Sequence, residues 1–167
     1  FVMEEYRKLG YEPTMTVKGG VLVDLGGKNK DKGLVLAAHT DTLGAMVCEI
    51  KDNGNLRVSP LGGMNPNNAE AENCRVITRF DNASIHVNGQ YNDTVRKYSG
   101  MEVVLDEKVE SKEDTQKLGI MVGDIVCFDP RTTVTDSGYI KSRFLDDKLS
   151  VGILLGYAKY IKDENIE

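Results

Sequence analysis

The sequence predicts an α/β protein into which a small β-rich domain is inserted, and three observations support this fold class. Residues 34–38 form an apolar run that ends abruptly at His39 and Asp41, which is typical of a strand buried on both faces of a sheet. Short strand-like segments separated by turn residues fill residues 47–138, as in small all-β domains. Residues 149–161 carry apolar side chains at four-residue steps, which predicts an amphipathic helix.

The first part of the chain predicts a helix, a hairpin and the buried strand, in that order. Apolar residues at helical spacing predict a helix over residues 1–9, and a glycine follows it as a stop signal. Residues 11–17 and 21–25 read as two strands joined by a glycine turn. The strand expected at residues 34–38 comes next, and His39 directly follows it, so His39 would lie at one end of the predicted sheet. In open α/β sheets, ligands bind at such strand ends.

The middle of the chain predicts an all-β unit with one short helix. An Asp-Asn-Gly turn at residues 52–54 joins strands expected at 44–50 and 56–58. Ser111, followed three residues later by Asp114, resembles a capping box and predicts the start of the short helix. Further strands are expected at residues 74–80, 83–88, 101–105, 125–128, 132–135 and 138–141.

An inserted domain would bring two distant polar groups together. Residues 1–46 and 139–167 would form one α/β domain, and residues 47–138 would form the insert. Asp146 precedes the last predicted helix, where the helix N-terminus favours negative charge. We expect the return of the chain to bring Asp146 to His39. One imidazole and one carboxylate are ligands that a zinc-like ion accepts.

Composition limits the classes of partner. The 167 residues suffice for one ordinary domain or two small ones. A formal net charge of −5 argues against a nucleic-acid partner. No signal peptide or membrane span is evident. Three scattered cysteines form no disulfide framework, which favours a cytoplasmic protein. The chain starts at Phe1 inside a helical pattern and ends at Glu167 just after another, so we expect a piece of a longer protein.

Two segments resemble the metal motifs of a peptidase family. AHTDTLGAMV at residues 38–47 and SRFLDDKLSVG at residues 142–152 are similar to the two metal-binding segments of dinuclear aminopeptidases of the tetrahedral (TET) type. Members of this family are also labelled glutamyl or deblocking aminopeptidase and endoglucanase or cellulase M. PLGG at residues 60–63, SKED at 111–114 and LGIMVGD at 118–124 resemble its inserted β domain. The resemblance implies a phosphorylase/hydrolase-like zinc-peptidase α/β domain with a small β-barrel-like insert.

The resemblance also implies roles for individual residues. His39 would bind one metal ion and Asp146 would bridge two, with a cis peptide bond between Asp146 and Asp147. Asp41 would hold and polarise His39 rather than bind metal. Each intact subunit would carry two divalent ions, with zinc or cobalt favoured and manganese as an alternative. The general-base glutamate and further ligands of the family would follow Glu167, so we expect these 167 residues alone to be inactive.

The resemblance implies an enzyme that removes N-terminal residues from short peptides. It also implies a homo-oligomer built from dimers and reaching a dodecamer, with the insert serving as an assembly or lid domain. A second hypothesis is an aspartyl aminopeptidase or another exopeptidase with co-catalytic zinc ions. A third is a non-catalytic assembly fragment. A cellulase is disfavoured, because the sequence offers no carboxylate pair flanking a sugar cleft and no tryptophan for sugar stacking.

Overall fold

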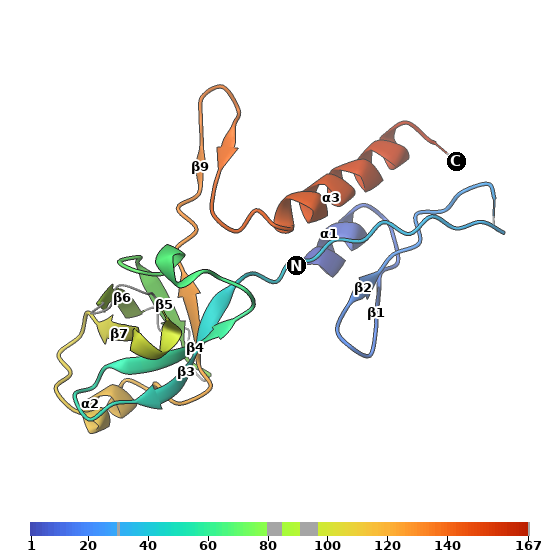
Figure 1. Cartoon of the computed structure of the whole chain (residues 1–167). Coiled ribbons are helices and arrows are strands. Elements are labelled where there is room, and N and C mark those ends of the chain that lie inside the picture. The colour runs from blue at the N-terminus through green and yellow to red at the C-terminus, as the bar shows by residue number, and fades with distance from the viewer. Residues whose placement is uncertain (30, 80–84, 91–96, 167) are drawn as a thin grey trace. The chain divides into compact units, whose positions relative to one another are not determined.

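The computed structural model divides the chain into two compact units (Figure 1). Unit 1 consists of Phe1–Asp41 and Leu145–Glu167, and unit 2 is Thr42–Phe144. The structure describes residues 1–29, 31–79, 85–90 (backbone only) and 97–166. The division falls after residues 41 and 144, whereas the sequence placed the domain boundaries after residues 46 and 138. None of the described helices is long and apolar enough to span a membrane.

Unit 2 is built on a closed antiparallel barrel of six strands (Figure 1). Around the barrel the order is β3-β4-β7-β6-β5-β8. Closure leaves no unpaired sheet edge. The strands are β3 (Gly44–Ile50), β4 (Leu56–Leu61), β5 (Cys74–Ile77), β6 (Ile85–Gln90), β7 (Glu102–Leu105) and β8 (Ile125–Phe128). The sequence predicted a strand at residues 83–88, where β6 lies. Its first two residues, 83 and 84, are outside the described residues.

Alternating burial along the strands places the core inside the barrel. Val47, Val76 and Val126 are completely buried, each from a different strand. Successive residues of a strand point to opposite faces, so every second residue lines the interior. Two short 3-10 helices, η1 (Pro66–Asn68) and η2 (Tyr98–Gly100), and a hairpin of β9 (Thr133–Val134) and β10 (Ile140–Lys141) complete unit 2 with helix α2 (Lys112–Lys117).

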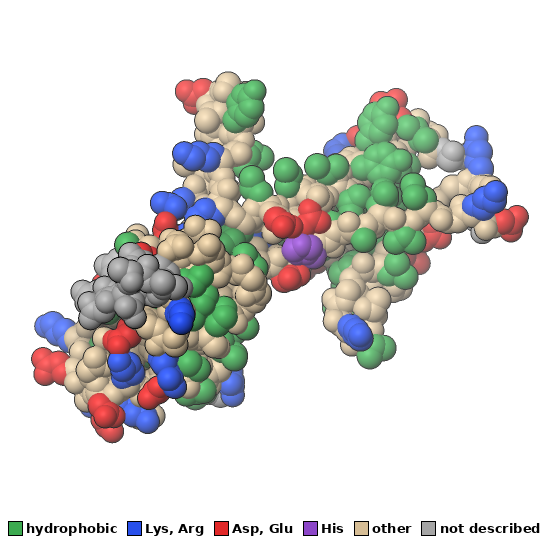
Figure 2. Space-filling view, viewed as in Figure 1, with side chains coloured by type: hydrophobic (Ala, Val, Ile, Leu, Met, Phe, Trp, Pro, Cys, Tyr) green, Lys and Arg blue, Asp and Glu red, His purple; other side chains and the backbone are tan. Residues whose placement is uncertain are grey.

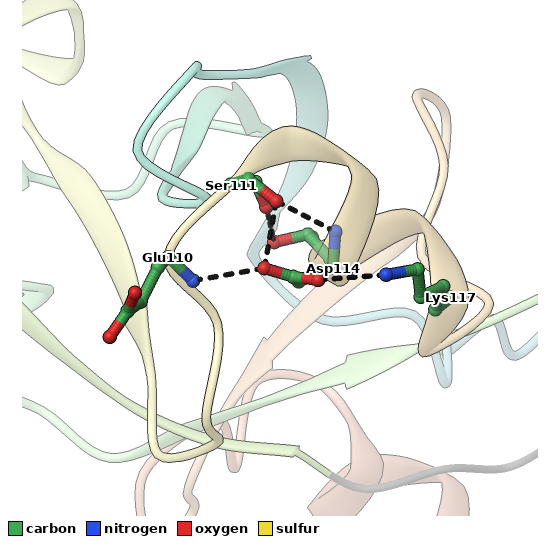
Figure 3. A network of polar contacts seen from close by, with 5 residues as sticks. Glu110, Ser111, Asp114 and Lys117 are labelled. Atoms are coloured by element: carbon green, nitrogen blue, oxygen red, sulfur yellow. Dashed lines mark hydrogen bonds and ion pairs between the residues drawn. The ribbon is translucent and has the colours of Figure 1, made fainter.

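Helix α2 starts at the capping box that the sequence predicted (Figure 3). The Ser111 hydroxyl accepts a hydrogen bond from the backbone N–H of Asp114 at 3.2 Å and donates one to its carboxylate at 2.7 Å. Lys117 lies 3.0 Å from the same carboxylate. These contacts, the Ser111 hydrogen bond first, lower the pKa of Asp114 to about 2. Buried Thr115 donates a hydrogen bond to the carbonyl of Gly54 at 2.7 Å and so ties α2 to the β3–β4 turn.

Unit 1 contains two helices and one short hairpin. Its elements are α1 (Val2–Lys8), β1 (Thr14–Met15), β2 (Val21–Leu22) and α3 (Lys148–Asp163). Helix α3 contacts α1. The hydroxyl of Tyr11 donates a hydrogen bond to the carbonyl of Ala158 at 3.0 Å, and the ring of Tyr6 meets that of Tyr11 edge-on. The predicted combination of an α/β unit with a β-barrel-like insert is confirmed.

One expected element of unit 1 is wrong. Residues 34–38 form no strand, and Leu34 and Val35 are 85% and 82% exposed rather than buried. A strand of a parallel sheet is buried by its neighbours in the sheet and by the helices over its faces. Among the described residues no strand pairs with this segment. The apolar face of α3 is exposed for the same reason, with Leu149 48% and Ile153 61% exposed.

Candidate metal centre

The structure brings His39 and Asp146 together within unit 1. The His39 Nε2 lies 3.3 Å from an oxygen of the Asp146 carboxylate. His39 follows the apolar segment 34–38, and Asp146 lies two residues before the start of α3. The peptide bond between Asp146 and Asp147 is cis, as the resemblance implied. The predicted meeting of these two side chains across the inserted domain is therefore observed.

Asp41 contacts the second ring nitrogen of His39, Nδ1. The Nδ1 of His39 lies 3.1 Å from the backbone carbonyl of Asp41 and 3.3 Å from its carboxylate. Because a carbonyl oxygen can only accept, this contact requires a proton on Nδ1. In the neutral ring the lone pair is then on Nε2, the nitrogen that faces Asp146. Asp41 thus sets the tautomer that a metal-binding histidine needs.

A lone pair facing a carboxylate requires a positive charge between them. A proton on Nε2 or a cation shared by Nε2 and Asp146 would satisfy both groups. Two ligands of one tetrahedral zinc ion, each about 2.0–2.2 Å from the metal, are themselves about 3.3–3.5 Å apart. The observed 3.3 Å separation between His39 Nε2 and Asp146 fits this value. The donor set, one imidazole and one carboxylate, fits as well.

Electrostatics at His39 favours the positive charge. Partial desolvation lowers the pKa of His39, but the hydrogen bond from Nδ1 to the Asp41 carbonyl raises it. The negative charges of Asp41, Asp146 and Asp147 also raise it, and the pKa of His39 lies above its ordinary value of 6.5. Figure 2 shows acidic side chains gathered around a histidine. The contribution of Asp147 to this field was not predicted, although its place beside Asp146 was the available signal.

The site is open and holds few ligands. The side chains of His39, Asp41 and Asp146 are 51%, 90% and 93% exposed, so a bound ion would be accessible. In the part of the chain that the structure describes, no group of three or more His, Cys, Asp or Glu side chains is arranged to hold a metal ion. Structural and catalytic zinc sites use three or four protein ligands. His39 and Asp146 together would supply two ligands.

A comparison with protein families identifies the chain's relatives. The model of the M42 glutamyl aminopeptidase family matches residues 19–167. The chain belongs to this family. The match extends over both units, including the segments that carry His39 and Asp146.

The chain is 43% identical over 160 residues to a protein of Bacillus subtilis that is named as the aminopeptidase YhfE. It is 26% identical over 169 residues to the glutamyl aminopeptidase of Lactococcus lactis. These alignments cover 90% and 95% of this chain, but only 46% and 48% of the two relatives. The chain therefore spans about half the length of the curated relatives it matches.

A solved structure shares the fold. The TET1 peptidase of Pyrococcus horikoshii superimposes with a TM-score of 0.82 over 99% of this chain and 51% of its own, at 21% sequence identity. That protein is described as assembling into a tetrahedron or a large octahedral shell. At 21% identity, this similarity shows the fold of the present chain and does not show its chemistry.

Proposed function

We propose that the protein is a metal-dependent aminopeptidase and that this chain supplies His39 and Asp146 as metal ligands. The observation that carries the proposal is the 3.3 Å approach of His39 Nε2 to the Asp146 carboxylate, with the Nδ1 proton directed to Asp41. Membership of the M42 glutamyl aminopeptidase family supports the reaction class. The exposed position of both ligands is compatible with access by a peptide.

Each of the three residues has a distinct part in the proposal. His39 would hold one divalent ion through Nε2, and Asp146 would help to hold both ions. Asp41 positions His39 and increases its basicity, as carboxylates beside metal-binding histidines do. When bound, two such ions would supply Lewis acidity for the hydrolysis of a peptide bond. Zinc or cobalt suits these ligands, and manganese is the alternative.

The 167 residues alone are proposed to be inactive. Two protein ligands are too few for tight binding of a catalytic ion, and no glutamate is assigned as general base, a group typically worth about 10²–10⁴-fold in rate. The described residues hold no third ligand at the site. The further ligands and the base would come from residues outside these 167, in keeping with relatives about twice as long.

Assembly and location complete the proposal. We infer a homo-oligomer built from dimers and reaching a dodecamer, in which the domain made by unit 2 acts as an assembly or lid domain. The shells described for the P. horikoshii protein support this inference. Enclosure would limit substrates to short peptides. The sequence holds three scattered cysteines with no disulfide framework in their spacing, which supports a reducing, cytoplasmic location.

Activity of the product of the complete gene tests the proposal. Aminoacyl p-nitroanilides would be hydrolysed, activity would be lost with EDTA, and Co²⁺ or Zn²⁺ would restore it. His39→Ala and Asp146→Asn should each lower kcat/KM at least 10³-fold, because each removes a ligand. Asp136→Asn, on an exposed turn, is the matched control and should leave activity unchanged.

Two results would contradict the proposal. Full activity of either ligand variant would exclude a metal site at His39 and Asp146. Folded protein with no peptidase activity under any metal would favour the non-catalytic assembly fragment.

A further inference from the structure

The hairpin of β9 and β10 in unit 2 is a two-stranded sheet with open outer edges, unlike the closed barrel (Figure 1). Among the described residues no third strand pairs with either β9 or β10. Val134, Tyr139 and Ile140 are 67%, 76% and 53% exposed. An isolated two-stranded hairpin is only marginally stable in water, and an open strand edge readily pairs with another strand. A further strand on one of the two edges would therefore stabilise the hairpin.

The hydrogen bonds of the hairpin show which backbone groups face its outer edges. The backbone N–H of Thr135 donates to the carbonyl of Tyr139 at 2.9 Å, so these two residues oppose each other at a hydrogen-bonded position. Hydrogen-bonded and non-hydrogen-bonded pairs alternate along an antiparallel ladder. The next pair, Val134 with Ile140, is therefore non-hydrogen-bonded. The N–H and C=O groups of Ile140 consequently point away from β9, to the outer edge of β10.

Contacts at both ends hold the hairpin in this register. At the turn, Gly138 has φ +88° and its N–H donates to the carbonyl of Thr135 at 2.8 Å. The Thr135 hydroxyl accepts a hydrogen bond from the N–H of Tyr139 at 3.0 Å. At the base, the hydroxyls of Thr132 and Ser142 lie 2.7 Å apart. The edge of β10 is thus already formed as a strand, which lowers the entropic cost of pairing.

The edge of β10 is complementary to a second copy of itself. An antiparallel β10 with its Ile140 opposite this Ile140 would exchange two backbone hydrogen bonds with it, because both N–H and C=O groups face outward. Such a contact has two-fold symmetry, in which the same surface is used on both subunits. Val134 and Ile140 oppose each other on one face of the hairpin. Pairing would therefore create an apolar row across four strands, and sheets of that size with an apolar face are stable.

The other face of β10 adds a charge complement. Tyr139 and Lys141 flank Ile140, are both exposed, and point to the face opposite to it. In the two-fold arrangement, Tyr139 opposes Lys141 of the partner subunit, and the reverse pair forms by symmetry. A lysine ammonium over a tyrosine ring is attractive, and no like charges oppose each other. The outer edge of β9 offers less, because the residues on both sides of Val134 are threonines.

We propose that the outer edge of β10 pairs with β10 of a second copy of the chain, with Ile140 opposite Ile140 of the partner subunit. The inference rests on the proposed function, which takes the protein as a homo-oligomer built from dimers, and it names the strand that joins two subunits. Stable interfaces bury about 1,200–2,000 Å², more than one short strand edge provides. The β10 contact therefore fixes the register and orientation of the two subunits within a larger interface.

Engineered cysteines in the product of the complete gene test this register. Opposed residues have Cα atoms about 5.5 Å apart in a hydrogen-bonded pair and about 4.5 Å apart in the other kind, and a disulfide spans both distances. Ile140→Cys should therefore form disulfide-linked dimers on mild oxidation with diamide. Tyr139→Cys and Lys141→Cys should link when co-expressed and much less when expressed separately. Ser137→Cys, exposed at the turn of the same hairpin, is the matched control. The wild type shows the background from its own cysteines.

Proline at Ile140 tests the backbone contact. Ile140→Pro removes an N–H that faces the outer edge and leaves the hydrogen bonds between β9 and β10 in place. It should raise the dimer Kd, measured by sedimentation, about tenfold or more, because two hydrogen bonds between subunits are lost. Val134→Pro makes the same change on the outer edge of β9 and should leave the dimer Kd unchanged. If Ile140→Pro fails to fold, the cysteine variants decide.

Three results would overturn the inference. Equal linking of Ile140→Cys and Ser137→Cys in a protein that is oligomeric would refute the β10 contact alone. Wild-type protein that sediments as a monomer at every concentration would contradict the proposed homo-oligomer and the β10 contact with it. A peptide substrate bound at the same edge would instead raise KM in Ile140→Pro with no change in the dimer Kd.

Discussion

At the scale of single residues, His39 is the most informative side chain in the molecule. Both of its ring nitrogens face acidic residues, Asp41 on one side and Asp146 on the other. The carbonyl of Asp41 identifies the protonated nitrogen, and the pKa of His39 is raised. These features assign the ring a positive partner on Nε2, which is a proton in metal-free protein at pH values below the His39 pKa and a divalent ion in the proposed enzyme.

The raised pKa of His39 can be measured in metal-free protein. The imidazole resonances of His39 should titrate with a midpoint above 6.5, and Asp41→Asn should lower that midpoint because it removes a negative charge. The interaction stabilises the folded state fully below about pH 6.5 and is lost as pH rises through the folded-state pKa. Metal binding should weaken over the same range as pH falls, since the proton competes for Nε2. A midpoint below 6.5 would contradict this account of the site.

Residue patterns predicted some side-chain contacts of the molecule and not others. The His-x-Asp segment and the Asp-Asp pair have recognisable spacing, so His39, Asp41 and Asp146 could be named in advance. The ion pair between Arg143 and Glu72 was not predicted, although Arg143 lies in the SRFLDDKLSVG segment that resembles the second metal motif. This ion pair joins a loop after η1 to the chain after β10, and nothing in the spacing of charged residues specifies which arginine meets which glutamate.

At the scale of elements, local chemistry accounts for the start and end of helix α2. Ser111 caps its first turn, and Gly119 follows it with φ +85°, a conformation that suits glycine at a helix end. The Asp114 carboxylate links the cap to Lys117, as Figure 3 shows. Each of these contacts lies within one helical turn, and for that reason the sequence alone predicted the helix.

Acid should remove the contribution of Asp114 to stability. Its pKa is about 2 in the folded state against an ordinary 3.8. The stabilisation is therefore complete above about pH 4 and is lost as pH falls toward 2. Asp114→Asn should lower Tm by a constant amount between pH 5 and 7, and this difference should shrink below pH 4. Ser111→Ala should cost about 1 kcal/mol. Glu113→Gln, exposed on the same helix, is the control, and a difference that persists at pH 2 would contradict the assignment.

The segment 34–38 shows where element prediction failed. Its apolar composition indicates a segment that burial would stabilise, but burial also requires neighbouring strands. Among the described residues it makes no backbone hydrogen bond, and Leu34 and Val35 face solvent. The exposed apolar face of α3 lacks the same cover. The pattern of hydrophobic residues predicts which face of an element must be buried. It does not predict which other elements cover that face.

Hydrogen exchange tests the state of this segment in the 167-residue chain. The amides of residues 34–38 should exchange within seconds, because no backbone acceptor protects them. The amides of β3, which pairs on both sides in the barrel, should be protected and serve as the internal control. Protection of residues 34–38 comparable to that of β3 would show that they are paired in solution, contrary to the structure.

At the scale of the whole molecule, the chain consists of a closed barrel and a second unit with apolar surface uncovered. Short strands and turns predicted a β-barrel-like insert. The order around the barrel could not be predicted, because β4 pairs with β7 and β3 with β8 across long stretches of sequence. Closure pairs each of the six barrel strands with a neighbour on both sides. Unit 1, by contrast, carries the proposed ligands on a surface with exposed Leu34, Val35 and Ile153.

The central claim is that His39 and Asp146 bind divalent metal. Anomalous X-ray diffraction at the zinc edge, from crystals of the complete gene product grown with Zn²⁺, tests it most directly. The account predicts one anomalous peak about 2.0–2.2 Å from both His39 Nε2 and an Asp146 oxygen, and a second peak on the other Asp146 oxygen. Zinc peaks elsewhere in the molecule, with His39 and Asp146 bound to no metal, would contradict it.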